Sequence, residues 1–240
     1  MKEKLYTIPV MDGFAEDCEC PLCAMRNTLE VNAVNYTMGP SYMEDDNRAM
    51  TDQKGFCTAH LKKLYEHQNR LGLALMLHTH MEKVGKDIEK LSKKANPKKA
   101  GLFKKAEKSA LSEYLDTLQG SCFICDRVNE TFERYYATIF HLFQYNDEFL
   151  PVLKECRGFC NEHYRQLIER APKHLSGYYL DSFLSILHER YLQNLSRLQG
   201  ELAWFIDKFD YENADKPWGT SQDALQRSMV KAGSIYYKKE

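Results

Sequence analysis

The chain has 240 residues, with 33 Lys and Arg against 34 Asp and Glu and a formal net charge of −1. Hydrophobic residues make up 43% of it and charged residues 28%, a composition typical of folded soluble proteins that excludes collagen-like, disordered and membrane-spanning chains. Because a chain of this size buries enough surface to fold without disulfides, and no signal-peptide pattern is present, we expect a cytoplasmic protein whose eight cysteines bind metal or carry redox chemistry.

The first predicted helix begins at Cys20-Pro21-Leu22-Cys23 and stops at Gly39-Pro40, a dipeptide that ends helices. Its apolar residues recur at helical spacing at Leu22, Met25, Leu29, Ala33 and Tyr36. A second helix is predicted to begin at Gly55-Phe56-Cys57-Thr58-Ala59-His60. A third, longer helix is predicted from the 3.6-residue period between Leu73 and Leu91.

A lysine-rich stretch follows, from Lys83 to Lys108, with ten lysines, three acidic residues and a local charge of +7. Charge runs of this kind are usually the solvated face of a helix or a mobile linker. The run lacks arginine, which nucleic-acid readers favour, so we expect nucleic-acid binding to be weak at most.

The second half of the chain repeats the pattern of the first. Cys122-Phe123-Ile124-Cys125 opens a helix with one apolar face at Ile124, Val128, Phe132, Tyr135, Ile139 and Leu142. Gly158-Phe159-Cys160-Asn161-Glu162-His163 opens the next helix, and a long one is predicted between Leu184 and Phe209. An aromatic C-terminal strap follows, with a last short helix capped by Ser221, and we expect this strap to pack back on the bundle.

Equivalent cysteines of the two halves lie 102 residues apart in the first motif and 103 in the second. This repeat predicts an all-α protein, a helical bundle built from two pseudo-symmetric three-helix repeats, each pinned by a Cys3His metal site. The predicted parts are a first repeat (1–95), a lysine-rich linker or helix (96–115), a second repeat (116–210) and a C-terminal strap with a short helix (211–240).

The repeated cysteines and histidines have the spacing of metal ligands. Two thiolates of C-x2-C can bind one ion, and a Cys and a His three residues apart on a first helical turn share a face. We therefore expect two sites, one formed by Cys20, Cys23, Cys57 and His60 and the other by Cys122, Cys125, Cys160 and His163. Three sulfurs and an imidazole favour zinc, two ions in all, with iron or an iron–sulfur cluster as the alternative. Cys18 and Cys156 fall outside the repeated set.

These residues also carry a resemblance. Cys-Pro-x-Cys, Met43-Glu44 ahead of Arg48, the paired Gly-Phe-Cys-x2-His and the ending Phe209-Asp210-Tyr211, Trp218-Gly219 and Asp223-Ala224 resemble an uncharacterised bacterial family, a domain of unknown function from anaerobic Gram-positive species. The resemblance implies a cytoplasmic, all-α protein and no particular activity. Phe123, where the first half has Pro21, departs from the motif.

The function expected from the sequence is that of a metal-stabilised binding or interaction module. Four protein ligands per ion close a site to substrate, and no nucleophile-elbow, metalloprotease or nucleotide-binding motif is present. Two alternatives stay open: an iron–sulfur or thiol-based redox protein, and a metal-dependent enzyme whose site can open. The expected partner is an unknown protein or small molecule, with no membrane span, and the oligomeric state stays open.

Overall fold

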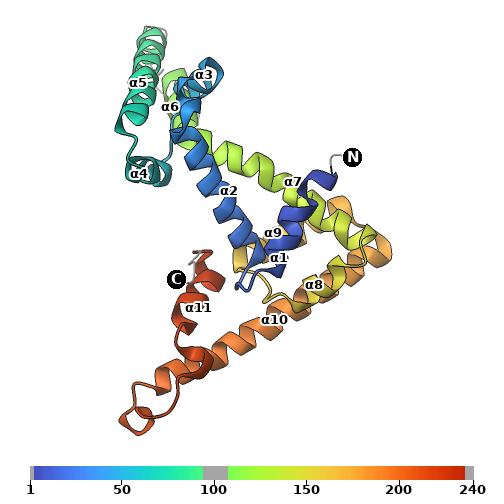
Figure 1. The fold of residues 1–240 in the computed structure, drawn as a ribbon. Coiled ribbons are helices and arrows are strands. Elements are labelled where there is room, and N and C mark those ends of the chain that lie inside the picture. The colour runs from blue at the N-terminus through green and yellow to red at the C-terminus, as the bar shows by residue number, and fades with distance from the viewer. Residues whose placement is uncertain (1–2, 94–107, 236–240) are drawn as a thin grey trace, which may run out of the picture. The chain divides into compact units, whose positions relative to one another are not determined.

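The computed structural model describes residues 3–93 and 108–235 (Figure 1). In these ranges all regular structure is helical, which confirms the predicted all-α class. The middle of the lysine-rich stretch, residues 94–107, lies outside the described residues. None of the described helices combines the length and hydropathy needed to cross a membrane.

The helices follow one another in an order that is similar in the two halves. The first half contains α1 (Thr7–Ala15), α2 (Pro21–Met38), α3 (Asp45–Lys54), α4 (Thr58–Glu66) and α5 (Arg70–Ser92). The second contains α6 (Ala110–Gly120), α7 (Phe123–Tyr145), α8 (Phe149–Glu155), α9 (Asn161–His174) and α10 (Gly177–Asp207), and α11 (Ala224–Gly233) follows. Short 3₁₀ turns lie at η1 (Glu3–Tyr6), η2 (Pro40–Met43), η3 (Tyr211–Asn213) and η4 (Gly219–Ser221).

The three helices predicted for each half are present, as α2, α4 and α5 and as α7, α9 and α10. α2 ends at Met38, directly before the Gly39-Pro40 stop, and α4 and α9 begin next to Cys57 and Cys160. On α7, every residue of the predicted apolar face is buried: Ile124, Val128, Phe132, Tyr135, Ile139 and Leu142. Hydrophobic periodicity therefore located the long helices correctly.

Each half also contains two shorter helices that apolar spacing did not predict. α3 has the sequence DDNRAMTDQK, in which only Thr51 is buried, so it carries no apolar stripe to detect. α8 contains Pro151, a residue that usually argues against a helix. The proline lies in the first turn of α8, where its missing N–H would have no intrahelical acceptor, and the helix tolerates it.

The chain divides into two compact units, and these differ from the two sequence repeats. Unit 1 comprises Met1–Thr28 and Thr131–Glu240, and unit 2 comprises Leu29–Glu130. Both boundaries fall inside long helices, since Thr28 lies in α2 and Thr131 lies in α7. Each unit consequently holds the start of one C-x2-C helix and the remainder of the other.

Unit 2 is built around one hydrophobic cluster. Its buried members are Ala33, Val34, Met38, Leu64, Leu73, Met76, Cys122, Phe123, Ile124 and Val128. α3 packs along α5, and α4 and α6 also contact α5 (Figure 1). Three residues of the C-x2-C motif, Cys122, Phe123 and Ile124, belong to this core, so apolar packing holds the motif in place.

Unit 1 has an aromatic core. Phe14 of α1 meets Phe149 of α8 edge to face with ring centroids 5.0 Å apart, and Phe140 of α7 meets Phe183 of α10 at 5.2 Å. α10 packs against α9 and α11, and α1 packs against α8 (Figure 1). These contacts hold the start of α9, which carries two of the predicted ligands.

The C-terminal strap packs back on α10 in part. Trp218 contacts Phe205 with ring centroids 5.6 Å apart, whereas Phe209 and Tyr211 are exposed. The last helix begins later than predicted, with Asp223 at its N-cap, because Ser221 belongs to the preceding turn η4.

Candidate metal centres

All eight predicted ligands gather into two groups of four, but the pairing differs from the predicted one. Centre 1, in unit 1, contains Cys20, Cys23, Cys160 and His163, and centre 2, in unit 2, contains Cys57, His60, Cys122 and Cys125. In each group the ligand atoms lie within 4.8 Å of one another. The expectation that each sequence repeat completes its own site is therefore wrong. The C-x2-C of each half meets the Cys-x2-His of the other half.

Both kinds of ligand pair lie at the first turn of a helix. Cys20 and Cys122 stand at the N-caps of α2 and α7, where their carbonyl oxygens accept the first helical hydrogen bonds from Ala24 and Asp126. Their partners Cys23 and Cys125 are three residues further on and so lie on the same face. The unpaired N–H groups and positive dipole end of a helix N-terminus favour nearby thiolates.

The Cys-x2-His pairs repeat this arrangement at α4 and α9. Cys57 and Cys160 are the N-caps, and the Cys160 Sγ accepts a hydrogen bond from the backbone N–H of His163 at 3.4 Å. The glycine of each Gly-Phe-Cys motif has positive φ, +59° at Gly55 and +74° at Gly158, a conformation that side chains rarely adopt. These glycines let the chain turn sharply into the helix start.

The difference between Pro21 and Phe123 has a structural reason. Both occupy the first helical position, where proline is favoured because its missing N–H has no intrahelical acceptor. In α7 the N–H of Phe123 donates to the carbonyl oxygen of Gly55 at 3.0 Å and so links the two ligand motifs of centre 2. Proline at this position would remove that bond.

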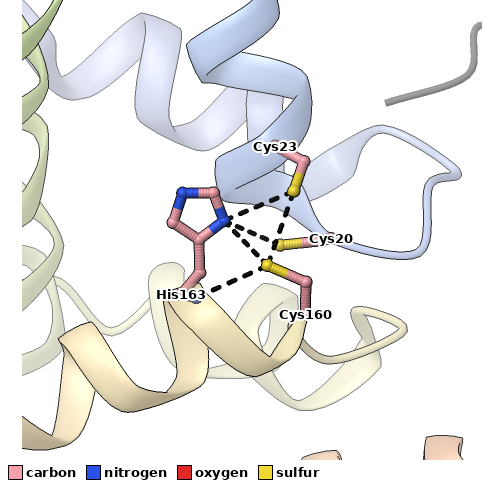
Figure 2. Close-up of side chains that lie close together, drawn as sticks. All are labelled: Cys20, Cys23, Cys160 and His163. Carbon is pink, nitrogen blue, oxygen red and sulfur yellow. Dashed lines mark hydrogen bonds between the residues drawn. The ribbon is translucent and has the colours of Figure 1, made fainter. Parts of the chain in front are cut away.

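At centre 1, the His163 Nδ1 faces all three sulfurs (Figure 2). It lies 3.1 Å from the Sγ of Cys160, 3.3 Å from that of Cys23 and 3.4 Å from that of Cys20. The Cys23 and Cys160 sulfurs are 3.6 Å apart, too far for a disulfide, and all the cysteines are free thiols. The four ligand residues are each at most 4% exposed.

Centre 2 has nearly the same geometry. The His60 Nδ1 lies 3.2 Å from the Sγ of Cys57 and 3.3 Å from those of Cys122 and Cys125. The Cys57 and Cys125 sulfurs are 3.8 Å apart. A tetrahedral zinc ion with ordinary bond lengths places its sulfurs roughly 3.8 Å apart and its sulfur and nitrogen roughly 3.5 Å apart. Both groups therefore have the dimensions of a single tetrahedral ion.

The electrostatics of centre 2 favour a cation among the ligands. Burial raises the pKa of Cys122, but the hydrogen bond with His60 outweighs it and the pKa falls to about 6. Burial raises the pKa of Cys125 to about 12, and the charge on Cys122 adds to this effect. The Cys122 thiolate thus forms readily and raises the pKa of Cys125, and a cation bound among the ligands would offset that repulsion.

A carboxylate supports the histidine of centre 2. Glu30 of α2 lies 2.7 Å from the His60 Nε2, and its other oxygen accepts from the Lys63 Nζ at 2.5 Å. The hydrogen bond with His60, together with Lys63, lowers the pKa of Glu30 to about 2. A carboxylate in this position fixes the ring orientation and makes the other nitrogen a better ligand.

Centre 1 lies beside a buried charge network around Glu19, the residue before Cys20. The Glu19 carboxylate accepts hydrogen bonds from Arg197 at 2.7 and 2.8 Å and from Arg227 at 3.2 Å, and the Lys231 Nζ lies 3.4 Å away. Burial alone would raise the pKa of Glu19, but Lys231 and Arg197 lower it. The network joins α10 and α11 to the loop that positions Cys20.

The family comparison agrees with the expectation that the chain belongs to an uncharacterised family. The model of a family of unknown function, DUF6062, matches residues 1–239. The chain belongs to the DUF6062 family. No curated protein and no solved structure matches it.

Sequence reasoning found the eight Cys and His residues of this DUF6062 chain but missed the groups that surround them. Glu30, Glu19 and Lys231 lie in no repeated motif, and a charged residue on a helix is most often solvated. The sequence gives one signal for these surrounding groups, because Glu19 directly precedes the ligand Cys20. Cys18 and Cys156 belong to neither group, as predicted.

Proposed function

We propose that this DUF6062 chain is a zinc-stabilised helical protein that holds two ions and serves as an interaction module. One observation carries the proposal: two groups of three cysteines and one histidine, each with the dimensions of one tetrahedral ion. Four protein ligands complete the coordination of zinc, as in structural sites.

The separation of the ligands along the chain supports a structural role. Centre 1 joins residues 143 positions apart, Cys20 and His163, and centre 2 joins Cys57 and Cys125, which are 68 apart. Holding such distant segments together costs loop-closure entropy, which metal binding offsets. Each ion would thus stabilise the unit that contains it.

The size of the groups supports a single ion over an iron–sulfur cluster. A cluster places several irons and sulfides between its protein ligands and would spread their sulfur atoms further apart. A single iron ion remains the alternative, because it also accepts tetrahedral sulfur-rich ligation. The eight free thiols support a reducing, cytoplasmic location.

A binding role is supported by apolar side chains exposed near the end of α10. Ile206 is 67% exposed, Phe209 77% and Tyr211 86%. Adjacent exposed apolar residues commonly mark contact surfaces for a protein or small molecule. Nucleic acid is a weaker candidate, because two lysines of α5 and the lysine directly after it are already paired with acids, as Lys83–Asp87, Lys86–Glu82 and Lys93–Glu89.

Metal analysis tests this proposal directly. The full chain, purified without oxygen, is expected to contain two zinc ions and to have no visible absorption. Chelation of both ions should reduce the helical circular-dichroism signal and lower the melting temperature. A chain that binds no metal, or a coloured one that contains iron, would contradict the zinc assignment.

A further inference from the structure

The two centres have the same ligands but differ in how well they are covered. At centre 1 all four ligand residues are buried, with Cys160 at 0% exposure. At centre 2, Cys122 and His60 are buried, but Cys57 and Cys125 are only half-buried. The repeat makes Cys57 equivalent to Cys160 and Cys125 equivalent to Cys23, so matched positions differ in solvent access.

The cover of centre 1 comes from the end of the chain. Ser234, directly after α11, donates from its Oγ to the Cys160 Sγ at 3.2 Å. Lys231 of α11 is buried, and its Nζ donates to the carbonyl oxygens of Glu19, at 2.5 Å, and Arg157. These two carbonyls lie in the loops that lead into the ligands of centre 1. α11 follows the second repeat in the sequence and belongs to unit 1. It therefore covers centre 1 with residues that are not part of the repeated sequence.

At centre 2 the two accessible sulfurs are neighbours. The Cys57 and Cys125 Sγ atoms are 3.8 Å apart and come from the starts of different helices, α4 and α7. A disulfide needs about 2.05 Å between sulfurs, a distance that a small movement of either side chain provides once the ion no longer holds them. Oxidation of cysteine follows thiolate character and exposure.

We propose that Cys57 and Cys125 are the oxidation site of this protein, at which a peroxide converts centre 2 to a disulfide and releases its ion while centre 1 stays intact. The proposal rests on the proposed zinc binding. One thiolate attacks hydrogen peroxide, which breaks the O–O bond and leaves a sulfenic acid and hydroxide. The second thiolate then displaces hydroxide from that sulfur and forms the S–S bond. Two thiolates thus lose two electrons to one peroxide, and protons from solvent convert both hydroxides to water.

The difference between the centres is one of access and not of affinity. Glu30 strengthens the bond of His60 to an ion, so centre 2 is not expected to bind metal weakly. Its reactivity comes from two sulfurs that a small oxidant can reach.

The experiment uses the full chain loaded with two zinc ions and treated with hydrogen peroxide. A chromogenic chelator follows zinc release, and mass spectrometry after alkylation locates oxidised cysteines. We expect one equivalent of zinc to leave roughly tenfold faster than the other, together with a Cys57–Cys125 disulfide. Ser234→Ala should accelerate release of the slow equivalent, whereas Ser228→Ala should not, because the Ser228 hydroxyl bonds to Ala224 within α11.

The outcomes separate the two proposals. Release of both ions at one rate, or earlier oxidation of Cys20, Cys23 or Cys160, would overturn the oxidation site and leave the zinc-binding proposal standing. Loading with fewer than two ions would overturn the zinc proposal itself and the oxidation site with it.

Discussion

Glu30 is the residue outside the ligand sets that acts most directly on a centre, through its 2.7 Å contact with His60. Glu30→Gln keeps a hydrogen-bond acceptor but removes the charge that makes His60 a stronger ligand. We expect zinc affinity at centre 2 to fall roughly ten- to a hundredfold, with centre 1 unchanged. Competition with a chelator of known affinity measures both sites.

Glu133→Gln is the matched control for this change. Glu133 pairs with Arg170 on the surface of unit 1 and contacts no ligand, so both affinities should match those of the parent. Equal affinities in Glu30→Gln and the parent would show that the carboxylate does not support the centre.

Residue types and spacings predicted the eight Cys and His residues but not how they combine. Each short motif fixes only its own pair, because two residues three apart on a helix start share a face. Two C-x2-C pairs and two Cys-x2-His pairs can combine in two ways, and both ways give two Cys3His sets. Which of these two combinations forms depends on tertiary packing, for example on the hydrogen bond from the Phe123 N–H to the Gly55 carbonyl oxygen. No local sequence pattern predicts such a contact.

At the scale of helices and loops, Lys208 organises the segment after α10. Its Nζ donates to the carbonyl oxygens of Asn213 at 2.6 Å, Ala214 at 2.8 Å and Lys216 at 2.6 Å, and it lies 5.2 Å from the centre of the Trp218 ring. The buried Lys208 side chain thus ties three backbone carbonyls of the loop together, in a segment that has little apolar core.

Lys208→Met should therefore loosen this loop by about 1–3 kcal/mol without disturbing either metal centre. Both tryptophans of the chain report on it, because the Trp204 Nε1 donates to the Pro217 carbonyl and Trp218 contacts Phe205. We expect red-shifted tryptophan emission and faster proteolysis within 208–218, with two zinc ions retained. Lys216→Met, which removes only an exposed contact to Asn213, should change neither signal. An unaltered emission spectrum in Lys208→Met would show that the lysine does not hold the loop.

Helices were predictable where one face is buried and not where burial is slight. α7 buries every position of its apolar stripe, and its periodicity was clear in the sequence. α3 has one buried residue, Thr51, and packs against α5. No pattern in its sequence predicts this packing. Tertiary contacts, more than propensity, stabilise such short polar helices.

At the scale of the whole molecule, the two sequence repeats exchange ligand pairs. Unit 1 takes Cys20 and Cys23 from the first repeat and Cys160 and His163 from the second, and unit 2 takes the complementary pairs. Neither half of the sequence contributes a complete centre by itself. Metal binding is therefore expected to depend on the whole chain, since each ion joins both repeats.

The crossed pairing is the central claim, and one variant tests it. Cys57→Ser in the full chain should lose one zinc ion, and native-state alkylation with N-ethylmaleimide should then modify Cys122 and Cys125, the partners left without an ion. Cys18→Ser, which removes a cysteine outside both groups, should keep two ions.

Mass spectrometry identifies the alkylated cysteines and so distinguishes this result from the contrary one. If Cys57→Ser exposes Cys20 and Cys23 to alkylation while Cys122 and Cys125 stay protected, each repeat closes its own site and the crossed arrangement is wrong. Alkylation of Cys122 and Cys125 with Cys20 and Cys23 still protected is the result that the structure predicts.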